Sequence, residues 1–143
     1  MTHHASHTPR GGTAAEKLRM AGLRPTRQRL TLCRLLFGQG DRHITAERLH
    51  AEAAAEGVGI SLATVYNTLH QLRTAGLVRQ IAVDGGRSFF DTNTHDHAHY
   101  FDESSASIGD LPIAQDDLKA LVVAPDGMEV ESVDVIVRLR KRA

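Results

Sequence analysis

Apolar residues recur at helical spacing through the first half of the chain. Four helices are predicted, beginning after Thr13, Thr26, Thr45 and Ser61, because Ser and Thr side chains accept hydrogen bonds from the free N–H groups of a first turn. The fourth helix ends at Gly76 and carries a narrow apolar stripe spaced 3, 4 and 3, which predicts a core-facing side. The stripe consists of Leu62, Val65, Leu69 and Leu72.

Strand-like segments follow these helices. Residues 79–83 and 87–92 flank Asp84-Gly85-Gly86, which predicts a β-hairpin. A His-rich strand comes next, then a second short strand or bend near 104–112 and a helix with Leu118, Leu121 and Val122 as its apolar positions. In the last segment, residues 128–142, alternate positions are apolar, which predicts a long strand. These positions are Val133, Val135, Val137 and Leu139.

The order of these elements predicts an α+β chain. Helices followed by a hairpin are typical of a winged helix-turn-helix, so we expect a disordered tail at 1–12, a DNA-binding domain at 13–92 and a metal-binding dimerisation domain at 93–143. About 50 residues are too few for a secure independent core, so we expect a copy of the chain to complete the second domain as a homodimer. A helical bundle with an ordinary polar face, and a monomer, are the alternatives.

The charge distribution supports two different roles. The chain has 17 basic and 17 acidic residues, but residues 1–92 hold 12 basic against 7 acidic, and residues 93–137 hold 1 against 10. A basic first half predicts contact with a polyanion. One cysteine, Cys33, permits no intrachain disulfide, and no apolar run approaches the ~20 residues of a membrane span. Both observations favour a cytoplasmic protein without a membrane partner.

The polar face of the fourth predicted helix suits recognition of double-stranded DNA. Small residues at its N-terminal end allow close approach, and Tyr66 and Asn67 are suited to phosphate, thymine-methyl or adenine contacts. Arg24 at the joint and Arg87 on the hairpin are placed to reach phosphates or a narrow minor groove. The complete predicted DNA-binding set is Arg24, Thr64, Tyr66, Asn67, Arg73 and Arg87.

Residues 89–103, F-F-D-T-N-T-H-D-H-A-H-Y-F-D-E, carry candidate metal chemistry. His95, His97 and His99 occupy every second position, which in a strand puts them on one face about 6.5–7 Å apart. Imidazole suits Zn, Fe, Cu and Ni, and carboxylate suits Mn and Mg, so this mixed set indicates a first-row divalent metal. A solvated polar strand is the alternative.

These segments together resemble the Fur family of metal-dependent transcription regulators. The specific pieces are A-G-L-R-P-T-R-Q-R-L at 21–30, H-I-T-A-E-R-L at 43–49, I-S-L-A-T-V-Y-N-T-L at 60–69, A-G-L-V at 75–78 and the His cluster. F-F-D-T-N-T before the cluster and E-V-E-S-V-D-V-I-V-R-L near the end are most similar to the iron response regulator branch of that family.

The resemblance implies one regulatory metal per subunit, held between the two domains. By motif its ligands fall on His43, Asp91, His97, His99 and Asp110, with His95 outside the set. Five N/O positions favour Mn²⁺ or Fe²⁺, with Zn²⁺ expected in vitro, and the iron response branch adds haem as a candidate. Asp102 and Ser105 stand where most members have C-x-x-C, so no Cys-type structural zinc is expected.

The sequence therefore predicts a regulator rather than an enzyme. We expect it to bind an A/T-rich palindromic operator and to control iron or haem homeostasis genes. A metalloenzyme or metal-storage protein using the same His/Asp cluster is the alternative. The chain offers no phosphate-binding Gly-rich loop and no Ser or Cys nucleophile with a plausible partner, which argues against catalysis.

Overall fold

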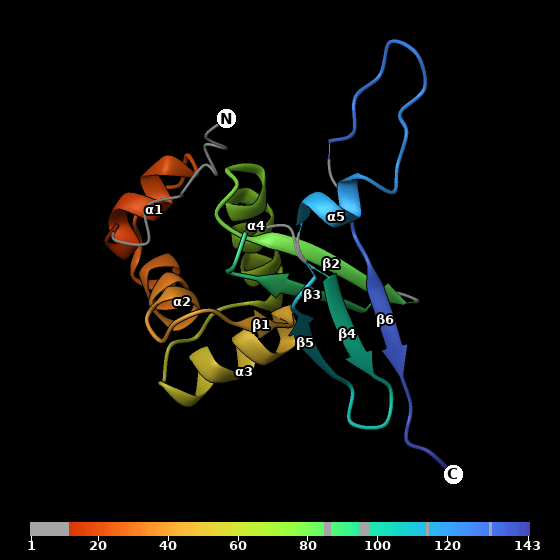
Figure 1. Cartoon of the computed structure of the whole chain (residues 1–143). Coiled ribbons are helices and arrows are strands. Elements are labelled where there is room, and N and C mark those ends of the chain that lie inside the picture. Colours follow the sequence, from red (N-terminus) through yellow and green to blue (C-terminus); the bar gives the residue numbers. More distant parts are fainter. Residues whose placement is uncertain (1–11, 85–86, 95–97, 114, 132) are drawn as a thin grey trace. The chain divides into compact units, whose positions relative to one another are not determined.

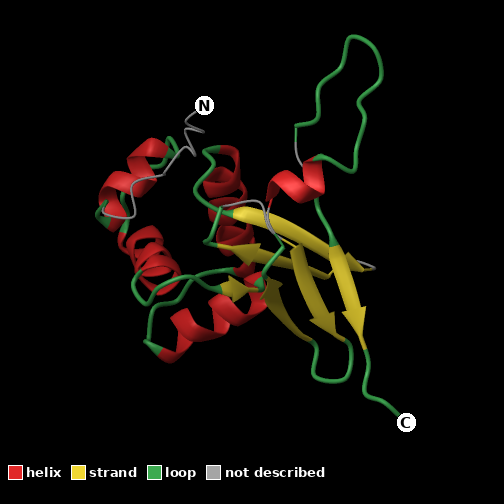
Figure 2. Ribbon diagram, in the orientation of Figure 1, coloured by secondary structure: helices red, strands yellow, loops and turns green. Residues whose placement is uncertain are grey.

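The computed structural model describes residues 12–84, 87–94, 98–113, 115–131 and 133–143. The chain divides into two compact units, residues 1–94 (unit 1) and 95–143 (unit 2). Unit 1 is mainly helical with a small sheet, and the described part of unit 2 contains a small sheet, one short helix and long loops (Figure 2). Among the described residues, no helix is long and apolar enough to cross a membrane.

Unit 1 contains four helices whose N-terminal caps match the sequence predictions (Figure 1). They are α1 (Ala14–Met20), α2 (Arg27–Phe37), α3 (Ala46–Ala55) and α4 (Leu62–Thr74), capped by Thr13, Thr26, Thr45 and Ser61. Thr13 and Glu16 form a complete capping box, in which each side chain bonds the other residue's backbone N–H. These bonds satisfy donors that would otherwise lack partners, so they define where each helix begins.

The sheet of unit 1 has the strand order β1-β3-β2. The predicted hairpin is confirmed as β2 (Arg79–Asp84) and β3 (Arg87–Asp91), antiparallel with a register shift between Ala82 and Asp84. The additional strand β1 (His43–Ile44) pairs antiparallel with β3 and was not predicted. Two residues are too few to show a period in the sequence, which explains why the pattern gave no sign of β1.

One apolar core holds unit 1 together. Leu18 comes from α1, Leu36 from α2 and Leu49 from α3, and the cluster closes on Phe90 from β3. Val65, Leu69 and Leu72 of α4 are buried as predicted, but Leu62 is 37 % exposed and its assignment to the core was wrong. Leu62 is the first residue of α4, where the helix extends beyond the core, and Thr68 is the buried residue that the stripe did not predict.

Unit 2 contains a second three-stranded sheet, in the order β5-β4-β6, and one helix. The hairpin of β4 (Ala98–Asp102) and β5 (Ser107–Leu111) is antiparallel, so the segment near 104–112 does form a strand. β6 (Ile136–Leu139) pairs parallel with β4. The long last strand was therefore wrong in extent, because β6 finds ladder partners only along His99–Asp102.

The helix of unit 2 is also shorter than its apolar residues suggested. α5 (Gln115–Lys119) buries Leu118 but ends before Leu121 and Val122, which are 80 % and 44 % exposed. A helix of this length depends on packing for its stability, and only Leu118 among its predicted apolar positions provides it.

Candidate metal centre

A histidine and an aspartate face each other directly across two strands of unit 1. His43 on β1 and Asp91 on β3 are register partners, which places both side chains on the same face of the antiparallel pair. Nε2 of His43 lies 3.0 Å from Oδ2 of Asp91, whose side chain is fully buried. The N–H of Asn93 donates to Oδ1 of Asp91 at 2.8 Å, which fixes the orientation of the carboxylate.

Unit 2 repeats this arrangement on its own sheet. His99 on β4 and Asp110 on β5 are register partners, and Nε2 of His99 lies 3.4 Å from Oδ1 of Asp110. The His99 side chain is 4 % exposed, while that of Asp110 is 44 % exposed. The N–H of His99 also donates to the carbonyl of Val135 at 2.9 Å, so the strand ladder holds this histidine from both sides.

Each unit thus offers one imidazole nitrogen and one carboxylate from directly opposed strand positions. Such a mixed N/O donor set fits a first-row divalent cation. Four of the five predicted ligands, His43, Asp91, His99 and Asp110, form these two pairs. The fifth, His97, lies outside the described residues, as does His95.

Asp102 and Ser105, which stand at the positions of the C-x-x-C motif, lie at a turn with several hydroxyl groups. Asp102 accepts hydrogen bonds from the N–H and hydroxyl of Ser104, at 2.9 and 2.8 Å, and from the hydroxyl of Ser105 at 2.9 Å. The Ser104 hydroxyl is the largest cause holding the pKa of Asp102 below its ordinary value, followed by that of Ser105. Hydrogen bonds therefore close a turn at which most relatives are expected to carry thiolates.

The predicted DNA-binding side chains differ in how exposed they are. Arg24, Asn67, Arg73 and Arg87 are exposed, whereas Thr64 and Tyr66 are half-buried. The hydroxyl of Ser61 donates to that of Thr64 at 2.8 Å, at the start of α4. The ring of Tyr66 packs against the core and stacks on His70 with the centroids 6.3 Å apart. Tyr66 is therefore partly a packing residue, unlike the freely exposed side chain that the helical pattern suggested.

Sequence reasoning missed several side chains that hold these groups in place. The hydroxyl of Tyr66 donates to Glu47 of α3 at 2.5 Å, which raises the pKa of Tyr66. Arg42 forms two hydrogen bonds with Glu52, also on α3. A spacing of four between Arg48 and Glu52 was a visible signal for one ion pair, but the contacts of Glu47 and Arg42 join separate elements and have no local signature.

Unit 1 consists of helices followed by a two-stranded wing, and a His–carboxylate pair lies on the strands of each unit. These features fit the class of metal-responsive transcription regulators that have a winged helix. The chain belongs to the ferric uptake regulator family, whose sequence profile matches residues 20–138. The family match confirms the predicted α+β architecture with its N-terminal winged helix.

The chain is also similar to a characterised repressor. It is 35 % identical over 98 residues to the peroxide-responsive repressor PerR of Staphylococcus aureus (strain Mu50 / ATCC 700699). That match spans 68 % of this chain and 66 % of the repressor, just under two thirds of the relative's length. These relatives are transcription regulators and not enzymes.

Two solved structures share the fold over nearly the whole chain. The ferric uptake regulator of Pseudomonas aeruginosa, solved with manganese, has a TM-score of 0.70 and 25 % identity, covering 92 % of this chain and 100 % of its own. The ferric uptake regulator of Vibrio cholerae has a TM-score of 0.72 and 26 % identity, covering 89 % of this chain and 98 % of its own.

Proposed function

We propose that this chain is a cytoplasmic homodimeric regulator that binds an A/T-rich palindromic operator under the control of one divalent metal ion per subunit. The observation that carries the proposal is the His–carboxylate pair on each unit, at 3.0 Å in unit 1 and 3.4 Å in unit 2. Neither pair alone supplies the four to six ligands that such an ion takes. The proposal is that one ion takes ligands from both pairs.

The proposed ligand set is His43 and Asp91 from unit 1 with His97, His99 and Asp110 from unit 2. The ion would supply a bond between the units, and the five N/O donors favour Mn²⁺ or Fe²⁺. The manganese in the Pseudomonas relative supports this choice. An ion that is bound best in one relative orientation of the two units favours that orientation. Only the difference in metal affinity between orientations can produce a switch.

The proposed DNA-binding surface is formed by α4 and by the wing, the β2–β3 hairpin. Asn67 and Arg73 lie exposed on α4, Arg87 on β3, and Arg24 at the joint before α2, so their polar atoms remain available to phosphates and base edges. Thr64 and Tyr66 complete the proposed set near the N-terminal half of the helix. Paired copies of α4 in a dimer would meet successive major grooves of a palindrome.

The proposed dimer interface lies on unit 2. Seven large hydrophobic side chains of its described residues are exposed, and a surface of this kind is typical of an interaction site. β5 and β6 are the two edge strands of this sheet, and a sheet edge is a common place for another chain to pair. A second copy of the chain would cover these side chains, which are Ile113, Leu121, Val122, Val123, Met128, Val137 and Leu139.

Control of iron or haem homeostasis genes, membership of the iron response regulator branch and haem as a further ligand remain predictions. They rest on the sequence motifs alone. Selecting operator sequences from a random DNA pool and identifying the metal in protein purified from its host would test all three.

The direct test of the proposed function is an electrophoretic mobility shift of the selected operator. The full-length protein is treated with EDTA, and Mn²⁺ is then added back. We expect operator affinity to change with Mn²⁺ in the wild type but not in His43→Ala. His50→Ala is the matched control, because His50 is a half-buried histidine of the same unit outside both pairs. Equal Mn²⁺ responses in wild type and His43→Ala would remove the metal switch from the proposal.

A further inference from the structure

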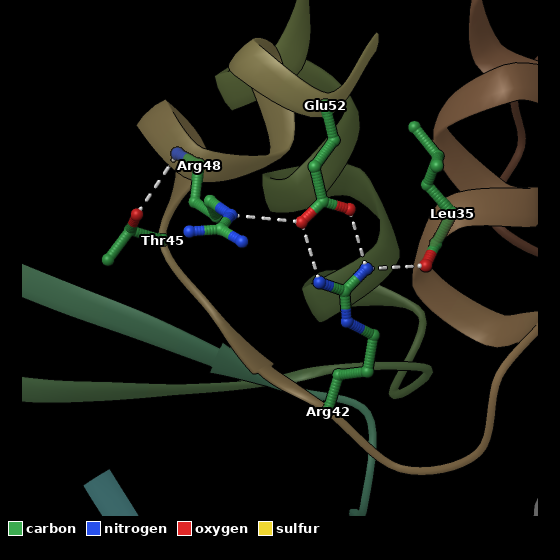
Figure 3. Close-up of polar contacts among 5 residues, drawn as sticks. All are labelled: Leu35, Arg42, Thr45, Arg48 and Glu52. Carbon is green, nitrogen blue, oxygen red and sulfur yellow. Dashed lines mark hydrogen bonds and ion pairs between the residues drawn. The ribbon is translucent and has the colours of Figure 1, made fainter. Parts of the chain in front are cut away.

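Arg42 connects more separate segments of unit 1 than its place in a loop suggests (Figure 3). One Nη atom of its guanidinium donates to the carbonyl of Leu35 on α2 at 2.9 Å and to Oε1 of Glu52 on α3 at 2.8 Å. The other Nη atom donates to Oε2 of Glu52 at 2.7 Å. The side chains of Arg42 and Glu52 are each 22 % exposed, so solvent screens this pair less than a surface pair.

The backbone of Arg42 is fixed just as firmly. Its N–H donates to Oγ1 of Thr92 at 2.8 Å, and its carbonyl accepts from the N–H of Thr92 at 3.0 Å. Arg42 directly precedes His43, and Thr92 directly follows Asp91. Two hydrogen bonds therefore close the strand pair immediately beside the His43–Asp91 pair.

Strand geometry separates the two faces of this junction. Successive side chains in an extended segment point to opposite faces, so Arg42 is directed toward α2 and α3 while His43 faces Asp91. A shift of His43 along or across β1 therefore displaces the guanidinium group of Arg42 relative to the carboxylate of Glu52. The planar guanidinium makes two parallel hydrogen bonds of fixed geometry, so it transmits such a shift instead of absorbing it.

Hydrogen bonds of α3 link Arg42 to α4, the helix proposed to contact DNA. Glu52 also accepts from Nε of Arg48 at 3.2 Å, one turn earlier on α3. At the first turn of the same helix, Glu47 accepts from the hydroxyl of Tyr66 on α4. α3 is therefore bonded through Glu52 to Arg42, the residue directly before β1, and through Glu47 to α4.

We propose that Arg42 is a positioning residue that couples the His43–Asp91 pair to α4 through α3. This inference rests on the proposed function and assigns one residue by which metal binding changes DNA affinity. Arg42 belongs neither to the proposed metal ligands nor to the proposed DNA-binding set. Its effect is measured by the coupling factor, the ratio of operator Kd values without and with Mn²⁺.

Unit 1 contains a matched control for this role. Arg34 of α2 forms hydrogen bonds through both Nη atoms with Glu56, the C-cap of α3, so it joins the same two helices. This pair lies more exposed, and Arg34 has no hydrogen bond to β1 or Thr92 among those described. A loss specific to Arg42 therefore reports the connection to β1 and not the clamping of α2 to α3.

The experiment measures the coupling factor in full-length Arg42→Lys and Arg34→Lys proteins. Lysine keeps the charge but loses the planar fork. We expect the coupling factor to fall at least about fivefold in Arg42→Lys, a change within the usual range of allosteric coupling, and to stay within about twofold of wild type in Arg34→Lys. Equal coupling factors in Arg42→Lys and wild type overturn the inference.

A second pair of variants tests the same link without altering the ion pair. Thr92→Val removes the Oγ1 acceptor used by the Arg42 N–H, and Thr92→Ser keeps it. Reduced coupling in Thr92→Val but not in Thr92→Ser supports the inference, even where Arg42→Lys folds poorly. Equal coupling factors in Thr92→Val and Thr92→Ser contradict the inference.

The Mn²⁺ response of the wild-type protein distinguishes a failure of this inference from a failure of the proposed function. A wild-type protein whose operator affinity is independent of Mn²⁺ overturns the proposed function itself. A normal wild-type response that Arg42→Lys and Thr92→Val both retain overturns only the role of Arg42.

Discussion

The two units bury apolar surface in different ways. Unit 1 gathers side chains from four helices and two strands into one closed core, with Leu32, Leu69 and Phe90 almost fully buried. In unit 2, the buried hydrophobic residues among those described are Ala98, Phe101 and Leu118. Unit 1 therefore has the closed core that an independent fold requires, whereas unit 2 leaves apolar side chains exposed. This difference is the reason why the dimer interface is proposed on unit 2 and not on unit 1.

Cutting the chain after Thr94 tests this contrast most severely. We expect residues 1–94 to fold cooperatively as a monomer, because every member of the unit 1 core is retained. Without unit 2, affinity for a palindrome should fall toward that of a single half-site. Sedimentation velocity and thermal unfolding measure the first effect, and an electrophoretic mobility shift measures the second. A truncated protein that sediments as a dimer would contradict the assignment of the interface to unit 2.

Phe90→Ala is expected to have the next largest effect, on the stability of unit 1. Phe90 is 1 % exposed, and truncating such a side chain in a core costs about 3–5 kcal/mol in the free energy of unfolding. Leu139→Ala in unit 2 is the control, because Leu139 is 43 % exposed and its loss should leave the unfolding of unit 1 unchanged. Chemical denaturation of the truncated and full-length proteins measures the difference.

Tyr66→Ala is expected to weaken specific operator binding by about 1–3 kcal/mol per half-site while the dimer and the metal affinity remain. Since the Tyr66 ring also packs against the core, Tyr66→Phe is needed beside it. Phenylalanine keeps the packing and removes the hydroxyl bonded to Glu47. Operator affinity equal to wild type in Tyr66→Ala would show that α4 does not read the DNA.

The histidines of unit 2 should contribute unequally to metal binding. We expect His97→Ala and His99→Ala each to lower Mn²⁺ affinity at least tenfold, about 1.4 kcal/mol, and His95→Ala to have a much smaller effect. Calorimetric titration of the three proteins gives this ranking. Acidification below about pH 6 should release the metal from the wild type, because a protonated imidazole cannot act as a ligand. Wild-type Mn²⁺ affinity in all three variants would show that these histidines are not metal ligands.

The smallest expected effect is on the acid stability of unit 1. Hydrogen bonding to Arg42 lowers the pKa of Glu52 below its ordinary value. A carboxylate with a lowered folded-state pKa stabilises the protein above its unfolded pKa, about 4.3, and this contribution is lost as pH falls through the folded pKa. Unfolding free energies measured between pH 7 and 3 should therefore decline less steeply in Glu52→Gln than in wild type. Glu56→Gln, at a more exposed pair, should follow the wild-type curve.

Local signals in the sequence predicted most of unit 1. Thr13, Thr26, Thr45 and Ser61 defined helix starts because capping depends on residues within one turn. The wing hairpin was equally local. Unit 2 was predicted less well, since the alternation from Val133 to Leu139 records apolar positions but not how many of them find a ladder partner.

The candidate site shows the same limit. Sequence motifs selected His43, Asp91, His99 and Asp110, and the structure shows how they are paired within each unit. His99 and Asp110 pair across the β4–β5 hairpin, whose register the sequence pattern did not define. The pairing of His43 with Asp91 depends on the register of β1 against β3, two segments that are distant in sequence and share no local period. The contacts of Arg42 with Leu35, Glu52 and Thr92 were invisible for the same reason.

The parallel pairing of β4 with β6 has a consequence for synthesis. His99 lies opposite Ile136, so the sheet of unit 2 closes only after a long intervening segment has left the ribosome. Unit 1, built from neighbouring helices, can fold much earlier, since local contacts require less loop closure than distant ones. Until β6 arrives, one edge of β4 remains open, and open strand edges promote aggregation. During synthesis we therefore expect a stage in which unit 1 is folded while the sheet of unit 2 still lacks β6.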